Sequence, residues 1–205
     1  MKKVILSAMA VFALSFANAQ EGEPTFGFSE GNIIVEGNIG FSSTNDKNTE
    51  TKTSGFNFNP KAGYFISDDL AIGLELGFGS NKAEVAGTEV SKSSSVGIGA
   101  FARYYFLDLG ARFKTYGEFG LGYNTENQKT PGDYKINTLG VGAGLGINYF
   151  VTDNIAINFG LTNILSYSSS KGDWDGAEAE NEFNFGFGQF NNFFETATFG
   201  MTFKF

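Results

Sequence analysis

Residues 139–149 read LGVGAGLGINY, and every second residue of this stretch is apolar. The apolar positions are Leu139, Val141, Ala143, Leu145, Ile147 and Tyr149. The positions between them are glycines and one asparagine, Asn148. Such alternation indicates a β-strand with two different faces, because successive side chains of a strand point to opposite sides. One face of this strand would be apolar, and the other face would carry almost no side chains because it consists mostly of glycine.

The same alternation recurs in seven further segments of the chain. They span residues 33–41, 56–64, 70–79, 96–106, 115–123, 155–162 and 197–205. Most are roughly 9–12 residues long, the length that a tilted strand needs to cross the hydrocarbon core of a bilayer. After Gln20 no apolar run is long enough for a membrane-spanning helix. Because bacterial single-chain barrels have an even strand number, the pattern predicts an all-β fold, an eight-stranded antiparallel up-and-down transmembrane β-barrel.

The connections between these strands alternate between short and long. The short ones cover 67–69, 107–112 and 152–154, and the long ones, rich in Ser, Thr, Asn, Lys and Glu, lie near 43–54, 81–93, 125–135 and 168–182. Short turns on one side and long loops on the other are typical of outer-membrane barrels, with the short turns in the periplasm. Residues 183–190 alternate as well, and we interpret them as a protruding start of strand eight, bent near Asn191 and Asn192. A loop hairpin is the alternative.

Aromatic residues cluster at both ends of the expected strands. Beside the short turns and the C-terminus lie Tyr64, Phe65, Tyr104, Tyr105, Phe106, Tyr149, Phe150, Phe203 and Phe205. Beside the long loops lie Phe41, Phe56, Phe58, Phe78, Tyr123 and Tyr167. Two such belts are expected where aromatic rings sit at lipid headgroup level. A soluble barrel of the lipocalin kind, with its apolar face inward, is the alternative, but it gives no reason for two belts.

The N-terminus has the three parts of a secretory signal. Lys2 and Lys3 precede an apolar run over 4–17, and Ala17-Asn18-Ala19 forms a small-x-small cleavage site. The run is too short for a membrane-spanning helix of about 20 residues. We therefore expect a cleaved signal peptide at 1–19, a barrel domain at 20–205, and export to the cell outer membrane of a Gram-negative-type bacterium.

Composition excludes several function classes. The 205 residues include no Cys and no His, so thiolate, Ser-His and His-ligated metal chemistry are absent. We expect no cofactor, no resident metal and no enzymatic activity. The net charge is −8, from 14 basic and 22 acidic residues, and loss of Lys2 and Lys3 would leave 12 − 22 = −10. An acidic chain is not expected to bind nucleic acid, whose phosphates favour basic surfaces.

Charged residues also occur on the face expected to point into the barrel. They are Glu36, Lys61, Glu75, Arg103 and Glu118. Buried charges persist when they are paired, and Arg103 and Glu118 would be neighbours across a hairpin. An eight-stranded barrel is just wide enough for its own side chains, so we expect a satisfied polar plug, with an ion path as the alternative. Strand-six glycines would make the room: Gly140, Gly142, Gly144 and Gly146 for Phe101, Arg103, Tyr105 and Tyr116.

The fourth long loop differs from the others in charge. Its acidic and aromatic residues are Asp173, Trp174, Asp175, Glu178, Glu180 and Glu182. Charge runs usually mark solvated segments, and the ligand spacing of a calcium loop is lacking. A solvated acidic loop is therefore expected, with divalent-ion bridging to lipopolysaccharide or contact with a partner as alternatives.

The runs Gly99–Tyr105 and Tyr116–Tyr123 and the ending Phe199–Phe205 resemble the outer-membrane beta-barrel domain family. That family groups small barrels similar to OmpX and the OmpA transmembrane domain, and the resemblance covers essentially the whole chain after the signal. It implies contact with outer-membrane lipid and lipopolysaccharide. It also implies a C-terminal signal read by the barrel-assembly machinery, at Phe199, Met201, Phe203 and Phe205.

Two functions fit these observations. The first is an integral outer-membrane barrel with a structural or surface-interaction role, in which the extracellular loops contact a partner that the sequence does not name. The second is a narrow porin-like channel for ions or small solutes.

Overall fold

The computed structural model describes residues 26–186 and 198–205, and within them the regular structure is entirely β-strand. The strands are β1 (Ile33–Asp46), β2 (Thr51–Phe65), β3 (Leu70–Val85), β4 (Thr88–Asp108), β5 (Phe113–Thr130), β6 (Tyr134–Phe150), β7 (Ile155–Gly172), β8 (Glu180–Phe185) and β9 (Thr198–Lys204). No helix among these residues is long and apolar enough to cross a membrane. The predicted signal peptide at 1–19 lies outside the described residues.

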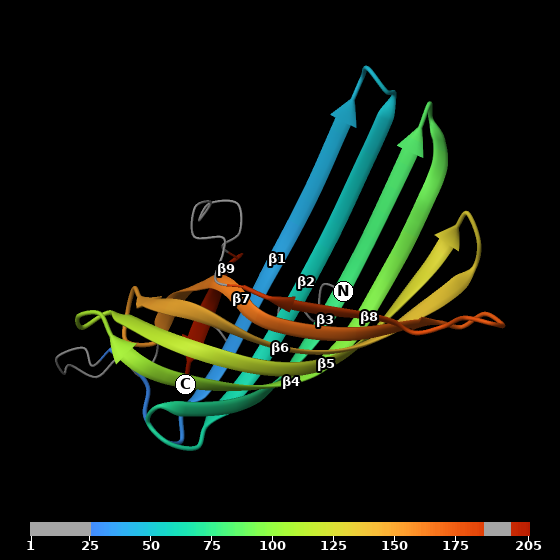
Figure 1. Cartoon of the computed structure of the whole chain (residues 1–205). Helices are drawn as coiled ribbons and strands as arrows, with labels where there is room; N and C mark the ends of the chain where they lie inside the picture. Colours follow the sequence, from blue (N-terminus) through green and yellow to red (C-terminus); the bar gives the residue numbers. More distant parts are fainter. Residues whose placement is uncertain (1–25, 187–197) are drawn as a thin grey trace, which may run out of the picture.

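Each strand from β1 to β7 pairs antiparallel with its neighbour, and β9 closes the ring between β7 and β1 (Figure 1). Ile34–Gly37 of β1 pair with Lys204–Met201, and Ile155–Gly160 of β7 pair with Phe203–Thr198. The predicted fold, a closed eight-stranded antiparallel barrel, is confirmed. At this level the closed ring of described strands has no open edge, which lipid does not tolerate. Above it, residues 38–46 of β1 pair only with β2 among the described residues.

β8 and β9 follow one another along the same edge of β7. β8 pairs with Leu165–Ser170, above the stretch that pairs with β9. Together they occupy the place of the eighth strand, in agreement with the interpretation of 183–190 as its start, as far as Gly186. The expected bend at Asn191 and Asn192 lies outside the described residues.

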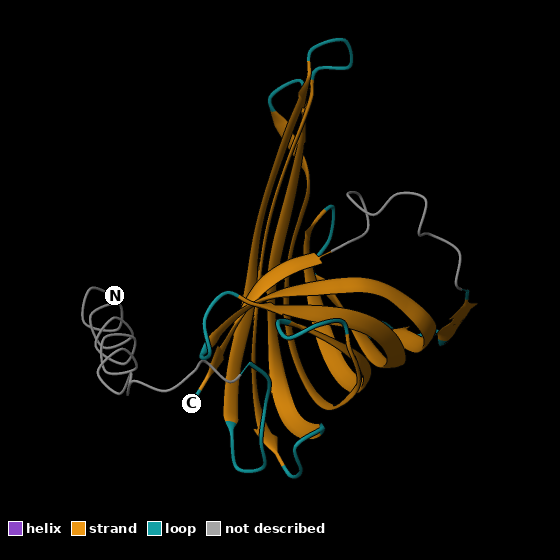
Figure 2. Cartoon of the chain, turned by 90° about the vertical axis from the view of Figure 1, so that its left-hand side faces the viewer, coloured by secondary structure: helices purple, strands orange, loops and turns teal. Residues whose placement is uncertain are grey.

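The long connections were predicted wrongly as loops, because three of them are mostly extensions of the strands. β3 continues to Val85, and Ala86 and Gly87, with φ of 48° and 77°, form a two-residue turn into β4. Positive φ at both positions gives a turn whose twist matches that of the two strands. Ser and Thr pair well across such hairpins, which explains why a polar sequence stays extended. Figures 1 and 2 show hairpins β1–β2 and β3–β4 rising together beyond the rest of the barrel.

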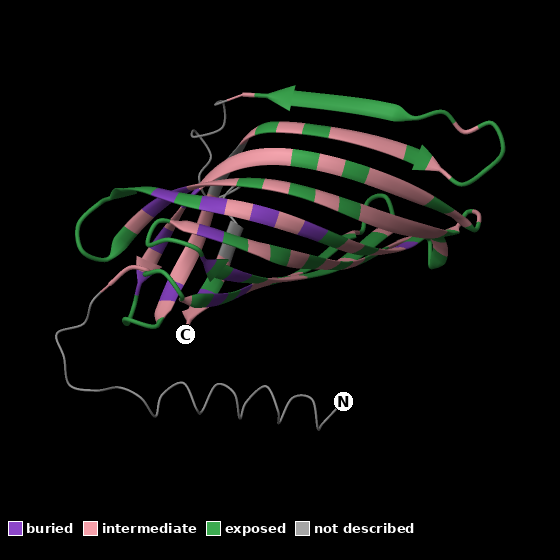
Figure 3. Ribbon diagram, turned by 90° about the horizontal axis from the view of Figure 1, so that it is seen from below, coloured by how far each residue is buried: buried purple, intermediate pink, exposed green. Residues whose placement is uncertain are grey.

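The apolar face of the strands points outward. Ile39, Leu74 and Ile98 keep 61%, 63% and 58% of their surface exposed, while Ile34 and Arg103, on the other face, are buried. Large aliphatic side chains exposed over a whole band are expected in lipid and exclude a barrel with its apolar face inward. Figure 3 shows this alternation along several strands, whereas β8 is exposed throughout. Buried residues gather toward the end that carries the C-terminus. We call this end, which bears the short turns, the lower end.

Six residues of the two predicted belts illustrate the outward position: Phe41, Phe58, Phe78, Tyr64, Tyr104 and Phe106 are all exposed. Three residues assigned to the lower belt are not. Phe65, Tyr105 and Phe150 are 0%, 6% and 0% exposed and lie inside the barrel. The physical reason is the strand period of two, since each directly follows or precedes a residue that points to lipid.

Candidate functional site

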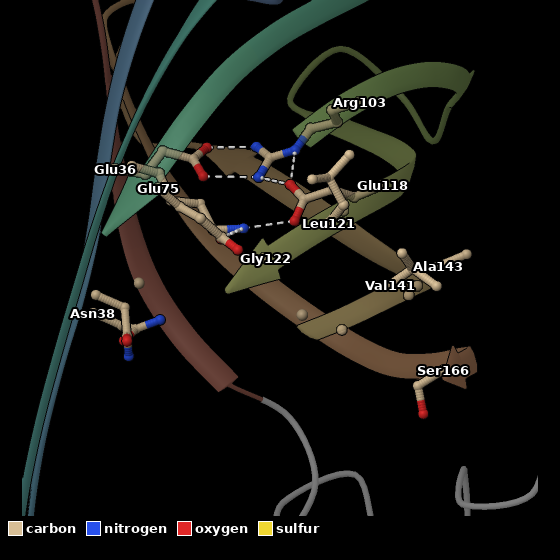
Figure 4. A pocket seen from close by; sticks show the side chains of 18 of the residues that line it. Glu36, Asn38, Glu75, Arg103, Glu118, Leu121, Gly122, Val141, Ala143 and Ser166 are labelled. Atoms are coloured by element: carbon tan, nitrogen blue, oxygen red, sulfur yellow. Dashed lines mark hydrogen bonds and ion pairs between the residues drawn. The ribbon is translucent and has the colours of Figure 1, made fainter. Parts of the chain in front are cut away.

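Five charged side chains meet inside the barrel, and we call them the ionic cluster. They are Glu36, Lys61, Glu75, Arg103 and Glu118, contributed by β1 to β5 in that order. The strand register aligns them: Glu36 lies opposite Lys61, Lys61 opposite Glu75, and Arg103 opposite Glu118. Figure 4 shows the arginine between two of the carboxylates. The five residues singled out in the sequence are thus brought together.

Arg103 is the centre of the ionic cluster and is 1% exposed. Its Nη1 and Nη2 donate to the two oxygens of Glu36, at 2.5 and 2.8 Å, and its Nε and Nη2 donate to Oε2 of Glu118, at 2.8 and 2.5 Å. The guanidinium also lies 4.1 Å from the centre of the Tyr116 ring. Bidentate pairing and stacking together offset the cost of burying this charge.

Lys61 is shared by two carboxylates. Its Nζ lies 2.6 Å from Oε1 of Glu118 and 2.9 Å from Oε2 of Glu75. Within the ionic cluster three carboxylates therefore face two cations, which gives a formal charge of 2 − 3 = −1. Glu75 has the most exposed side chain of the ionic cluster, at 34%. The surplus negative charge thus lies toward the open side of the cluster.

Uncharged polar groups donate the remaining hydrogen bonds to the Glu36 carboxylate. Oε1 accepts from Thr202 Oγ1 at 2.7 Å and Oε2 accepts from Asn158 Nδ2 at 3.2 Å. Asn148 donates to Thr202, and Tyr116 donates to Asn158. Sequence reasoning placed Tyr116 inside the barrel, but it missed the part that Tyr116, Thr202, Asn158 and Asn148 play in this network. The available signal was position, since Asn148 and Tyr116 have the strand parity of inward-facing residues.

An aromatic layer lies directly below the ionic cluster and was also missed. Phe28, from the segment before β1, packs its ring 4.4 Å from Phe65, 4.7 Å from Tyr105 and 5.1 Å from Phe150, centre to centre. The Tyr105 hydroxyl accepts from Arg103 at 3.3 Å, so layer and cluster are joined. These four aromatic residues fill the lower mouth of the barrel.

Backbone contacts hold the segment of Phe28 in place. Gly31 N donates to Phe65 O, Glu30 N donates to Asp68 Oδ1, and Lys204 Nζ donates to Gly27 O, all within 2.8–2.9 Å. The segment that contains Phe28, residues 26–32, therefore runs across the short-turn end of the barrel. We call this segment the strap. Its sequence signal was the pair Phe26 and Phe28 on alternate positions just before the first strand.

The strand-six glycines do not all play the predicted role. A β-carbon on Gly146 would lie 2.2 Å from Cζ of Tyr116, so this glycine does make room for a ring. Gly140 faces only a backbone oxygen at 3.8 Å. Phe101 gains its space from Gly63 and Gly73 instead. Gly140, Gly142 and Gly144 line a cavity of about 570 Å³, and the five residues of the ionic cluster line its lower part, so the interior is not filled along its whole length. Figure 4 shows Asn38 and Ser166 beside this cavity, away from the charges.

The predicted acidic loop is shorter than expected. Glu180 and Glu182 lie on β8, since they pair with Ser170 and Ser168 of β7. Asp173 accepts from Lys135 N at 2.8 Å, and Trp174 packs edge-on against Tyr134 at 5.2 Å. These two residues thus fasten the loop to the start of β6. Asp175 and Glu178 are exposed, and the described residues hold no group of three or more acidic side chains arranged for a metal ion.

The predicted assembly signal lies on β9 and just after it. Met201 and Phe205 are 47% and 43% exposed on the outer face. Phe205 also exchanges two backbone hydrogen bonds with Ile33, at 2.9 and 3.0 Å. The last residue therefore helps to close the ring, beyond any role as a signal. The Phe199 side chain lies outside the described residues.

Comparisons with known proteins agree with this architecture. The family model for the outer membrane protein beta-barrel domain matches residues 5–189. Outer membrane porin F of Pseudomonas fluorescens is 27% identical over 169 residues, which cover 74% of this chain and 51% of that protein. The chain thus spans about half the length of this relative.

Among solved structures, OprG shows the same fold. The outer membrane protein OprG of Pseudomonas aeruginosa is 16% identical, with a TM-score of 0.52 over 87% of this chain and 98% of that one. The N-terminal barrel domain of OprF from the same organism is 18% identical, with a TM-score of 0.41 over 86% of this chain and 98% of that one. At this identity the likeness to OprG concerns the fold alone.

Proposed function

Because the chain belongs to the outer membrane protein beta-barrel domain family, we propose that it is an outer-membrane barrel with a structural or surface-interaction role and no catalytic one. Its short turns would face the periplasm and its long hairpins the outside, as in other barrels of this kind. The hairpins would make the contacts with lipopolysaccharide or an extracellular partner. Residues 1–19, with their basic start and apolar run, would direct export and be cleaved.

One observation carries this proposal: the lower interior is occupied by two successive layers. Arg103 is held by Glu36 and Glu118, and the rings of Phe28, Phe65, Tyr105 and Phe150 lie beneath it. An ion that entered from outside would have to separate a buried ion pair and then displace a packed aromatic layer. Both steps are costly in a low-dielectric interior.

A narrow channel is the second candidate, and the shared Lys61 favours it. Since Glu75 and Glu118 compete for one ammonium group, Lys61 could shift to Glu75 and loosen one side of Arg103. The porin name of the Pseudomonas fluorescens relative is compatible with such a path.

Planar-bilayer recording with the purified protein separates the two functions. The sealed barrel predicts no steady unit conductance for the wild type. A steady conductance that Glu118→Ala or Arg103→Ala changes would favour the channel and contradict the seal. Heat-modifiable migration in SDS gels, recorded for each variant, controls for folding.

The C-terminal assembly signal is a separate part of the proposal. Because Phe205 makes backbone hydrogen bonds with Ile33, the informative change is Phe205→Ala, which keeps them. The variant should refold in detergent micelles yet reach the outer membrane poorly in cells. Normal levels in the outer membrane would contradict a role for this ring in assembly.

A further inference from the structure

The upper interior has a different chemistry from the ionic cluster. A groove of about 250 Å³ lies on the inner face of β1 to β5, and its polar side chains are uncharged. They are Ser42, Asn57, Asn59, Asn81, Ser95 and Asn124, which we call the amide face. Asn59 and Asn124 also line the cavity of about 570 Å³, so groove and cavity are continuous. None of the described residues that line the groove carries a charge.

Glycines shape the floor of the amide face. Asn57 lies opposite Gly40 and Gly79 on the neighbouring strands, and Gly79 lies opposite Ser95. A β-carbon on Gly40 would lie 2.1 Å from Asn57 Oδ1, and one on Gly79 would lie 2.4 Å from Ser95 Oγ. Each polar side chain can therefore lie across its neighbouring strand, with its donor and acceptor atoms directed along the groove.

Most of this hydrogen-bonding capacity is not taken up by other described protein groups. Asn59 donates to Asn38 at 2.8 Å. The side chains of Asn57, Asn81 and Asn124 have no hydrogen-bond partner among the described residues. An amide offers two donors and an acceptor within one planar group. The amide face thus presents to solvent several donors and acceptors that are not bonded to other described residues, within one concavity.

The outer face of the same hairpins shows that this composition is not a general property of exposed strands. At the same height Lys82 pairs with Glu84 at 2.5 Å on the outward side, and Lys52 has the same outward parity. On the inner face, Glu126, opposite Ser95, and Asp46, opposite Thr51, are charged, but neither lines the groove. The opposite wall of the cavity continues the uncharged lining with Ser166 and Ser168.

This lining selects among ligand classes. An anion would need an unpaired cation and a metal ion would need free carboxylates. The described lining of the groove has neither, and the two cations and three carboxylates that line the cavity beneath it are paired with one another. An apolar ligand would leave the amides without partners, which is costly. A hydroxyl group both donates and accepts, as an amide does. A cavity of about 570 Å³ is within the range of about 300–1,000 Å³ that is usual for ligand sites.

We propose that the amide face and the cavity beneath it bind a neutral oligosaccharide that enters from outside the cell. The proposal rests on the proposed function in one respect, since it needs the extracellular end to be accessible. The proposal names the class of ligand that the surface-interaction role would involve. Closure of the lower end is not required for binding.

The test is an NMR titration of the full-length folded protein in a detergent without a sugar headgroup. Maltotriose, mannotriose and N-acetylated chitotriose are added in turn, and the side-chain amides of Asn57, Asn59 and Asn81 are followed. At least one sugar should give saturable shifts at these amides, with much smaller shifts at Asn45 and Asn48 near the β1–β2 turn. Replacing both Asn57 and Asn81 by Leu should weaken binding at least tenfold, whereas Asn45→Leu on the outer face should not.

Two outcomes would overturn the proposal: no saturable shift with any of the three sugars, or equal affinity in the double variant. Gel migration before and after boiling verifies that each variant is folded. Failure of the proposed function would be seen separately, as conductance of the wild type in bilayers. A conducting protein that still binds the sugar would contradict the seal and leave the oligosaccharide site standing.

Discussion

The lower and upper halves of the barrel interior use the same strand alternation for opposite purposes. In the lower half, Gly146 and Gly73 lie against the rings of Tyr116 and Phe101, and the space is filled. In the upper half, Gly140 and Gly142 face only backbone oxygens within 4 Å and a serine β-carbon, and space is left open. The comparison teaches that a glycine-rich inward face does not by itself predict a packed or a hollow barrel. The outcome depends on whether a large side chain lies on a nearby strand.

The largest effect is expected from Arg103→Met, which removes the charge from the lower half and keeps most of the volume. Glu36 and Glu118 would be left without their buried partner, which should lower the free energy of unfolding by about 3–5 kcal/mol. Lys82→Met is the matched control, because its exposed ion pair is worth about 0–1 kcal/mol. Urea unfolding in lipid vesicles measures both. Equal effects of the two changes would contradict a difference between buried and exposed pairs.

The next largest effect is expected when one glycine in each half of the barrel interior is replaced by valine. Gly146→Val should force Tyr116 to move, at a cost of about 1–3 kcal/mol for overpacking. Gly140→Val should cost clearly less, since a β-carbon there has its nearest neighbour at 3.8 Å. The comparison of the two unfolding midpoints would sharpen the distinction between filled and hollow halves. A larger loss for Gly140→Val would mean that the upper half is packed after all.

Removing the Phe28 ring should have a similar or slightly smaller effect. Phe28→Ala loses three aromatic contacts, and each aromatic pair contributes about 0.5–1.5 kcal/mol. A partly buried ring at the barrel mouth is expected at the low end, about 1–2 kcal/mol in total. Phe41→Ala, on the outer face and 76% exposed, is the control. If both variants unfold like the wild type, the strap contributes nothing to the lower layer.

The smallest effect is expected from breaking the ion pair between Lys82 and Glu84, which lies on the outward face of β3 above the lipid. The hydrogen bond and the positive charge of Lys82 hold the pKa of Glu84 below its usual range. A lowered folded-state pKa gives stability that is present above the unfolded pKa of about 4.3 and is lost as the pH falls through the folded value. An NMR titration should show the Glu84 pKa rising toward its usual value in Lys82→Met. An unchanged pKa would show that this ion pair does not persist in solution.

The sequence was sufficient for the fold because alternation between apolar and small residues directly reports the two faces of a strand. It also placed Arg103 and Glu118 correctly, since both lie beside the same short turn and share the inward parity. It failed for the polar hairpins near 81–93, where neither face is apolar and the alternation carries no signal. The alternate positions of Phe26 and Phe28 mark an aromatic segment, but they do not place Phe28 inside the barrel, because a ring that precedes the first strand has no register to locate it.

Cysteine accessibility tests the central claim most directly, since the chain has no native cysteine. Ser95→Cys places a thiol in the upper groove, and Ala71→Cys places one in the buried core beside Phe65 and Tyr105. A charged, membrane-impermeant thiol reagent is added from the extracellular side and, in separate samples, from the periplasmic side. The account predicts rapid labelling of Ser95→Cys from outside and no labelling of Ala71→Cys from either side. Rapid labelling of folded Ala71→Cys from outside would contradict a barrel that is open above and sealed below.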